Sequence, residues 1–110
     1  MTELNISFYS ISKLDPRYSK TLCDTTNKRT KKSVDFILDL MDIKDNDLAI
    51  DVKKDWFENL INKLKTMKSQ MVPGMENYNA VEYLLGRLNF IAYEIYWNLD
   101  DVKMYVGYWD

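Results

Sequence analysis

Apolar residues recur at helical spacing through residues 78–99, and we expect the rest of the chain to pack around this segment. Its main stripe, in which successive members lie three or four positions apart, consists of Val81, Leu84, Leu88, Ile91 and Ile95. A helix rises about 1.5 Å per residue, so this one would run roughly 30 Å, about the width of a small domain. The pattern therefore predicts a long amphipathic helix at the centre of the fold.

Residues 33–43 and 48–70 show the same helical periodicity, which predicts two further helices. The segment 72–74, Val-Pro-Gly, ends the second of them, because proline cannot continue a helix and glycine favours a turn. Gly86 lies inside the segment 78–99, at a cost of about 1 kcal/mol relative to alanine. We expect a close crossing by another helix to account for this glycine.

The two ends of the chain have a different pattern. Residues 4–11 alternate between apolar and polar side chains, which is typical of a half-buried strand, although an extended arm lying on helices would look the same. Residues 102–109 favour a strand or a short helix, and as a strand they would pair with residues 4–11. Pro16 favours a turn or opens a short helix, and residues 24–32 are polar and poorly patterned, so we expect a loop there.

These segments together predict a mainly α, indeed all-α, fold. We expect a single globular domain over residues 1–110, with three to four helices in a bundle-like arrangement. The pattern leaves open whether this bundle includes a small terminal β element, formed by residues 4–11 with residues 102–109. The chain has only three glycines and two prolines, which argues against an all-β fold with many turns.

The composition excludes several kinds of chemistry. The chain contains no histidine, so the commonest general base and the commonest metal ligand are absent, and Cys23 is its only cysteine. The three glycines are isolated, so no phosphate-binding glycine loop is present. Residues 45–47, Asp-Asn-Asp, lack the glycine and glutamate that complete a calcium loop. We therefore expect a protein that is not an enzyme and needs neither a metal nor a cofactor.

The chain has no membrane-targeting pattern. No window of 18 uninterrupted apolar residues is present, and residues 1–10 have neither the basic nor the apolar region of a secretory signal. A single cysteine cannot form an internal disulfide, which suits a reducing compartment. We expect a cytoplasmic protein with no membrane partner.

The charge is unevenly spread along the chain. Residues 1–32 have a net charge of +4 and residues 33–110 a net charge of −6. Carboxylates combined with Tyr and Trp are typical of tight protein interfaces, because the rings provide desolvated anchors while the acids steer a basic partner. The predicted partner-binding residues are Asp35, Asp39, Asp42, Asp45, Asp47, Tyr93, Tyr96, Trp97, Asp100, Asp101, Tyr105, Tyr108 and Trp109.

Two alternatives use other features. A basic cluster at Lys28, Arg29, Lys31 and Lys32 could contact nucleic-acid phosphates, which would make the protein a small helical regulator. The cluster is short and has no interleaved aromatic residues, which is more typical of a solvated loop, so we do not expect nucleic acid to be the partner. In the second alternative the aromatic residues form a homodimer interface in a structural subunit.

In size, acidity and lack of catalytic groups, the chain resembles small bacterial immunity proteins, and phage-encoded inhibitors are similar in the same respects. Immunity proteins bind and block cognate toxins, which are often basic nucleases. The resemblance, which is one of general character over the whole chain, implies an antitoxin-type inhibitor that covers the active site of a basic toxin or nuclease domain with its acidic and aromatic surface. Charge reversal at Asp39 and Asp42 is then expected to slow association.

Overall fold

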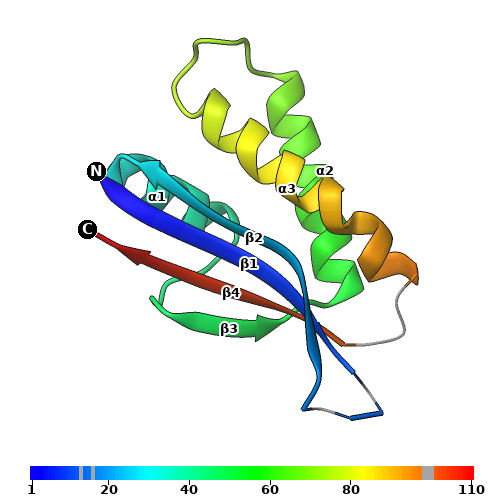
Figure 1. Ribbon diagram of the computed structural model, residues 1–110. Coiled ribbons are helices and arrows are strands. Elements are labelled where there is room, and N and C mark those ends of the chain that lie inside the picture. The colour runs from blue at the N-terminus through cyan, green and yellow to red at the C-terminus, as the bar shows by residue number, and fades with distance from the viewer. Residues whose placement is uncertain (13, 16, 98–100) are drawn as a thin grey trace.

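The protein is a mixed α/β domain, so the prediction of a mainly α, all-α helical bundle is wrong. The computed structural model describes residues 1–12, 14–15, 17–97 and 101–110. Its elements in chain order are β1 (Thr2–Ile11), β2 (Ser19–Arg29), α1 (Lys31–Leu40), β3 (Leu48–Asp51), α2 (Lys54–Ser69), α3 (Tyr78–Trp97) and β4 (Asp101–Trp109). In this part of the chain an antiparallel sheet forms one layer and the three helices form a second layer on one of its faces (Figure 1).

The sheet has the strand order β2-β1-β4-β3, with all neighbouring strands antiparallel. The strands from the two ends of the chain, β1 and β4, therefore form its centre, and both termini lie at one end of the sheet (Figure 1). Leu4 lies opposite Tyr108 and Ile11 lies opposite Asp101. The pairing of residues 4–11 with 102–109, which the sequence left open, is confirmed.

The alternation along β1 separates a buried face from an open one. Leu4, Ile6 and Phe8 are fully buried against the helices, while the residues between them are only half buried. β4 repeats the pattern with Val102 and Met104. A sheet that buries one face and leaves the other to solvent needs this period of two.

The loop expected over residues 24–32 is wrong, because residues 24–29 belong to β2 and α1 already begins at Lys31. β2 is an edge strand, and few of its residues enter the core, Cys23 among them. Its pairing with β1 shifts by one residue near Phe8, where Leu22 is an extra residue, as in a β-bulge. An edge strand with one open side needs few apolar residues, so the hydrophobic pattern is too weak to predict it. Pro16, for which the sequence predicts a turn or a helix start, lies outside the described residues.

The predicted helix over residues 48–70 divides into a short strand and a helix. Leu48–Asp51 pair with β4 as β3, and the Val52 amide N–H extends this pairing by donating to the Val102 carbonyl at 2.9 Å. The alternation of Leu48, Ile50 and Val52 is the strand signal that the helical pattern masked. The helix itself, α2, begins at Lys54.

The helical prediction for residues 78–99 is confirmed over α3, since Val81, Leu84, Leu88 and Ile91 are all buried. The expected helix crossing at Gly86 is wrong, because no other element of the described structure lies within 4 Å of the position of an added Cβ. The predicted helix over residues 33–43 corresponds to α1. None of the helices in the described part of the chain is long and apolar enough to cross a membrane.

Candidate functional site

The uncovered side of the sheet forms the first candidate surface, which we call the open face. It consists of the strand side chains that point away from the helices, together with Asp47, which immediately precedes β3. Its charged and aromatic members are Glu3, Tyr9, Asp24, Lys28, Asp47, Asp51, Asp101, Lys103, Tyr105 and Trp109. Five of these residues are acidic and two are basic, so the surface has a net negative charge.

Hydrogen bonds stabilise the ionised form of two of these carboxylates. Asp24 accepts hydrogen bonds from Asn5 Nδ2 at 3.0 Å and from Ser7 Oγ at 2.9 Å, and the two donors lower its pKa. Asp51 accepts a 2.5 Å hydrogen bond from Lys103 Nζ, which lowers the pKa of the carboxyl and raises that of the ammonium.

Tyr105 lies at the centre of the open face. Its hydroxyl donates to Asp47 Oδ1 at 2.5 Å, and this hydrogen bond is the main cause of the raised pKa of the phenol. The ring covers Gly107, where an added Cβ would lie 2.4 Å from the Tyr105 hydroxyl oxygen. Asn46 positions the loop before β3, because its side chain donates to the Tyr108 carbonyl and accepts from the Tyr108 amide.

The structure does not gather the thirteen predicted residues into one surface. Asp47, Asp101, Tyr105 and Trp109 belong to the open face, although Asp101 and Trp109 lie at opposite ends of β4. Asp35 and Asp39 are exposed on α1, Asp42 ends that helix, and Asp45 is exposed in the following loop. Tyr93 is exposed on α3, and Lys31 lies over the ring of Tyr108, 4.9 Å from its centre. Asp100 and the side chains of Tyr96 and Trp97 lie outside the described part of the structure.

Sequence reasoning missed Glu3, Tyr9, Asp24, Asp51 and Lys103 as members of the open face. The alternation of β1 was a usable signal for Glu3 and Tyr9, since both occupy the polar positions between buried residues. Asp24 and Asp51 belong to the two strands that were not predicted, so the sequence offered no face on which to place them.

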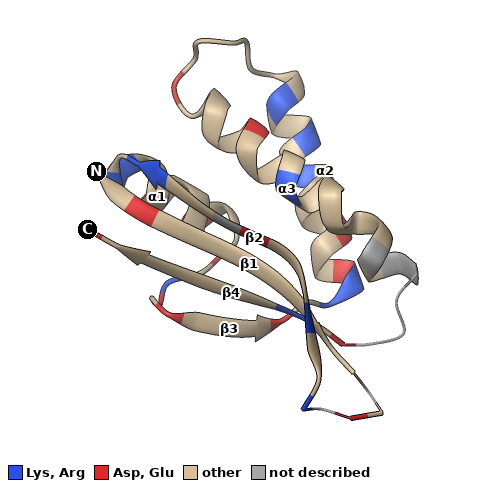
Figure 2. Ribbon diagram, in the orientation of Figure 1, with Lys and Arg blue, Asp and Glu red and all other residues tan. Residues whose placement is uncertain are grey.

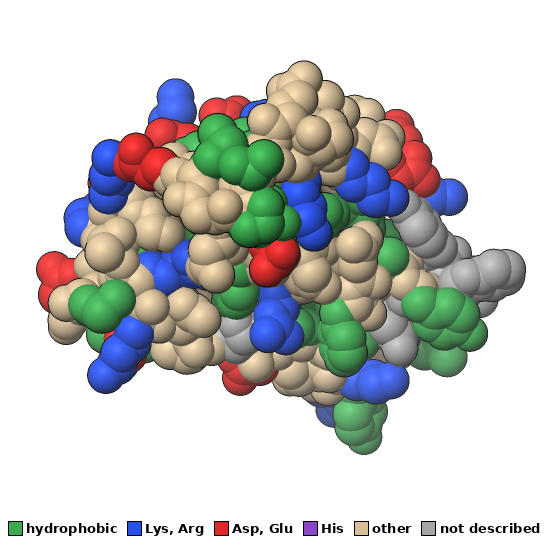
Figure 3. Space-filling view, turned by 90° about the horizontal axis from the view of Figure 1, so that it is seen from above, with side chains coloured by type: hydrophobic (Ala, Val, Ile, Leu, Met, Phe, Trp, Pro, Cys, Tyr) green, Lys and Arg blue, Asp and Glu red, His purple; other side chains and the backbone are tan. Residues whose placement is uncertain are grey.

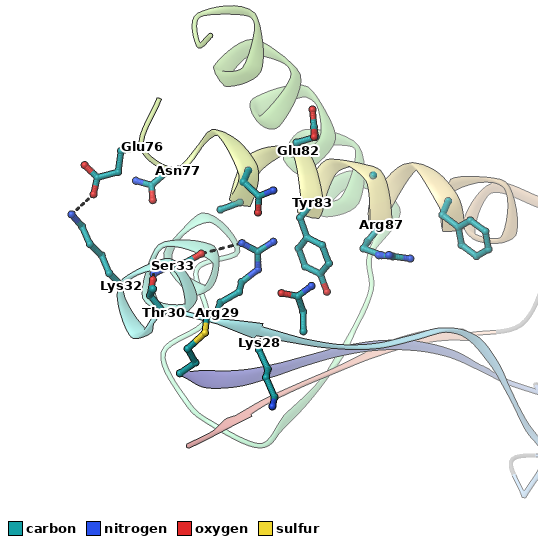
Figure 4. Close-up of a pocket in the computed structure, with 16 residues that line it drawn as sticks. Lys28, Arg29, Thr30, Lys32, Ser33, Glu76, Asn77, Glu82, Tyr83 and Arg87 are labelled. Carbon is teal, nitrogen blue, oxygen red and sulfur yellow. Dashed lines mark hydrogen bonds and ion pairs between the residues drawn. The ribbon is translucent and has the colours of Figure 1, made fainter. Parts of the chain in front are cut away.

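A second candidate surface is a groove of about 830 Å³ on the helix side of the sheet (Figure 4). It lies between the end of β2, the start of α1 and the first four turns of α3. Arg29 comes from β2, Ser33 from α1, and Tyr83 and Arg87 from α3. We call this hollow the α1–α3 groove.

Arg29 is a buried cation in the wall of the α1–α3 groove. Only 8% of its surface is exposed, its Nη1 donates to Ser33 Oγ at 3.1 Å, and its Nε has no hydrogen-bond partner. The guanidinium lies 4.5 Å from the centre of the Tyr83 ring. Within the described residues no carboxylate lies within ion-pair distance of it, and burial lowers its pKa.

The basic cluster predicted at residues 28–32 does not form one basic patch. Lys28 points to the opposite side of β2 from Arg29 and lies 4.0 Å from Glu3 (Figure 4). Lys31 pairs with Asp35 at 2.6 Å, and Lys32 pairs with Glu76. Basic segments meet where β2 joins α1 (Figure 2), but on the face seen in Figure 3 the cationic side chains are interspersed with acidic and apolar ones.

Neither surface offers a set of metal ligands: no group of three or more His, Cys, Asp or Glu residues that could hold a metal ion is found in the described ranges. Comparison with protein-family models, curated proteins and solved structures finds no match to this chain.

Proposed function

We propose that this protein is a non-enzymatic inhibitor that binds a basic protein through the open face. The observation on which the proposal rests is the excess of carboxylates on a sheet face that no helix covers in the described part of the chain. Such a face attracts a positively charged partner and speeds its association.

The aromatic residues of the open face suit the same role. Trp109 is 46% exposed, and Tyr9 and Tyr105 are half buried, so their rings have already lost part of their conformational freedom. Rigid aromatic anchors surrounded by polar groups are typical of binding hot spots. The partner class that fits this surface is a basic toxin or nuclease domain, whose active site the protein would cover in the manner of small immunity proteins. Such an inhibitor acts in the cytoplasm, where Cys23 stays reduced.

The dispersal of Lys28, Lys31 and Lys32 does not favour the alternative of a nucleic-acid-binding regulator. Each of the three ammonium groups has a carboxylate partner of its own, so a nucleic-acid backbone would have to displace three ion pairs. Binding to phosphates also requires cations along one continuous surface.

The experiment is a pull-down from the native host with tagged protein, at low and at high salt, followed by mass spectrometry of the retained proteins. We expect one stoichiometric basic protein at low salt and less of it at high salt. Mixing that protein with the inhibitor should abolish its activity at a one-to-one ratio. Retained DNA or RNA that elutes with salt, or self-association alone on gel filtration, would contradict the proposal.

A further inference from the structure

The α1–α3 groove contains a buried cation with no carboxylate within ion-pair distance among the described residues. Glu76 and Glu82 also line the groove, but they pair with Lys32 and Lys68. Arg29 is 8% exposed, and its one hydrogen bond to a side chain goes to the neutral hydroxyl of Ser33. Removing a charge from water is costly unless an opposite charge and further hydrogen bonds compensate. An anion bound in the groove would supply both.

The start of α1 adds positive potential at the same place. Thr30 caps the helix, and the first turn contains Lys31 and Lys32 but no acidic residue. The N-terminus of a helix is the positive end of its dipole, so an anion is favourable there. Lys31 and Lys32 already pair with Asp35 and Glu76, so the positive charge open to an anion is that of Arg29 and the helix terminus. Because Arg29 directly precedes this cap, both features act at the same end of the groove.

The other end of the groove has room for an organic group. Gly86 faces it, and nothing outside its own helix lies within 4 Å of an added Cβ there. Arg87 lies 5.6 Å from the centre of the Tyr83 ring, and Phe90 is 67% exposed one turn beyond Gly86. Arginine and phenylalanine side chains at such an opening can stack on a planar ring. A volume of about 830 Å³ is also much larger than an inorganic ion needs.

We propose that the α1–α3 groove binds a phosphate monoester of a small molecule with a planar aromatic group. The phosphate lies against Arg29 and the first turn of α1, because guanidinium groups match the geometry of phosphate oxygens and a dianion suits the local charge. The planar group lies over Gly86, between Arg87 and Phe90. This site is on the opposite side of the sheet from the open face, so it is independent of the proposed inhibitor function.

The test uses adenosine 5′-monophosphate as the probe, with inorganic phosphate and adenosine as its two parts. Calorimetry measures each affinity, and the ¹⁵N–¹H signal of the Arg29 Nε–H group reports occupancy from inside the groove. We expect the monophosphate to bind more tightly than inorganic phosphate, adenosine to bind much more weakly than either, and both phosphates to shift the Nε–H signal.

Substitutions in the α1–α3 groove test which residues bind each part of the probe. Arg29→Met should weaken the binding of both the monophosphate and inorganic phosphate by about tenfold or more. Arg87→Met and Gly86→Leu should weaken the binding of the monophosphate but leave the affinity for inorganic phosphate nearly unchanged. These two variants keep the test valid if Arg29→Met fails to fold. Arg17→Met is the matched control, because Arg17 pairs with Asp15 in the exposed β1–β2 connection.

Three results would overturn the proposal. The first is the absence of any shift of the Nε–H signal with either phosphate. The second is a monophosphate affinity that a folded Arg29→Met variant does not lower. The third is equal affinity for the monophosphate and inorganic phosphate, which would remove the organic part of the proposed ligand.

Discussion

At the scale of single residues, the open face depends on contacts that join distant parts of the chain. The hydrogen bond between Tyr105 and Asp47 is one of them, and it raises the pKa of the phenol because the carboxylate favours the protonated form. A group whose pKa is raised by folding stabilises the fold below its unfolded pKa, here near 10, and loses that effect as pH rises through the folded value.

Asp47→Asn should therefore lower the pKa of Tyr105 towards the ordinary tyrosine value. Alkaline titration of the protein followed by ultraviolet absorbance or tyrosine NMR signals measures this change. Asp45→Asn, in the same exposed loop, removes an equal charge but leaves the Asp47 carboxylate in place, so it is the matched control. An unchanged Tyr105 pKa in Asp47→Asn would show that the contact does not form in solution.

Gly86 has no packing role that would explain a glycine inside a helix. An added Cβ meets no neighbouring element, so Gly86→Ala should raise the free energy of unfolding by about 0.5–1 kcal/mol through the higher helix propensity of alanine. Urea denaturation without any ligand measures the difference. A loss of stability would mean that another part of the protein occupies the groove.

At the scale of elements, the sequence predicts segments that bury a complete stripe or alternate strictly. α3 and β1 were predicted because their apolar residues follow the periods of a helix and of a strand. β2 was missed because an edge strand with a polar open side needs few apolar residues, although Thr21, Thr25 and Thr26 are a weak strand signal. β3 was missed because its four residues lead almost directly into α2.

The same limits apply to the candidate sites. Asp47 and Tyr105 are both among the predicted residues, but their contact spans 58 positions and needs the β3–β4 pairing to form. The carboxylates on β2 and β3 could not be placed without those strands. Arg29 was predicted only as part of a basic cluster, since nothing in the local pattern shows that its side chain turns inward while that of Lys28 turns outward.

Asp42 belongs to the end of α1 rather than to an acidic stripe on its surface. Its backbone has φ 56°, and the Asp42 and Ile43 amides donate to the Asp39 and Leu38 carbonyls in a Schellman-type cap. Glycine is favoured at such a position, so Asp42→Gly should raise the free energy of unfolding by about 0.5–1 kcal/mol.

Asp39→Gly is the matched control for Asp42→Gly, since it removes the same charge inside the helix. It should lower the free energy of unfolding by about 0.5–1 kcal/mol, because glycine is a poor helix former. Urea denaturation compares both variants with the wild type. Changes of the same sign in the two variants would argue against the cap.

At the scale of the whole molecule, the fold depends on its last strand. β4 lies between β1 and β3 and places Val102, Met104 and Val106 in the core. Deleting residues 101–110 should therefore abolish cooperative unfolding. β3 would lose its only neighbour in the described sheet, and the core would lose the buried side chains of β4. Circular dichroism during thermal denaturation measures this, and a retained sharp transition would contradict the central role of β4.

The open face and the α1–α3 groove lie on opposite sides of the sheet. A protein partner on the open face and a small anion in the groove would therefore not compete for the same surface. Conversely, variants of one surface can serve as controls for the other.

The measurement that tests the central claim most directly compares two charge reversals in the pull-down. One double variant, the open-face pair, combines Glu3→Lys with Asp51→Lys. The other, the α1 pair, combines Asp35→Lys with Asp39→Lys and makes the same change in net charge on α1. Circular dichroism first establishes that both variants are folded. We predict that the open-face pair loses the basic partner at low salt while the α1 pair retains it. This replaces the sequence-based expectation for Asp39, because α1 lies on the helix side of the sheet and not on the open face. Retention by the open-face pair, with loss by the α1 pair, would contradict binding through the open face.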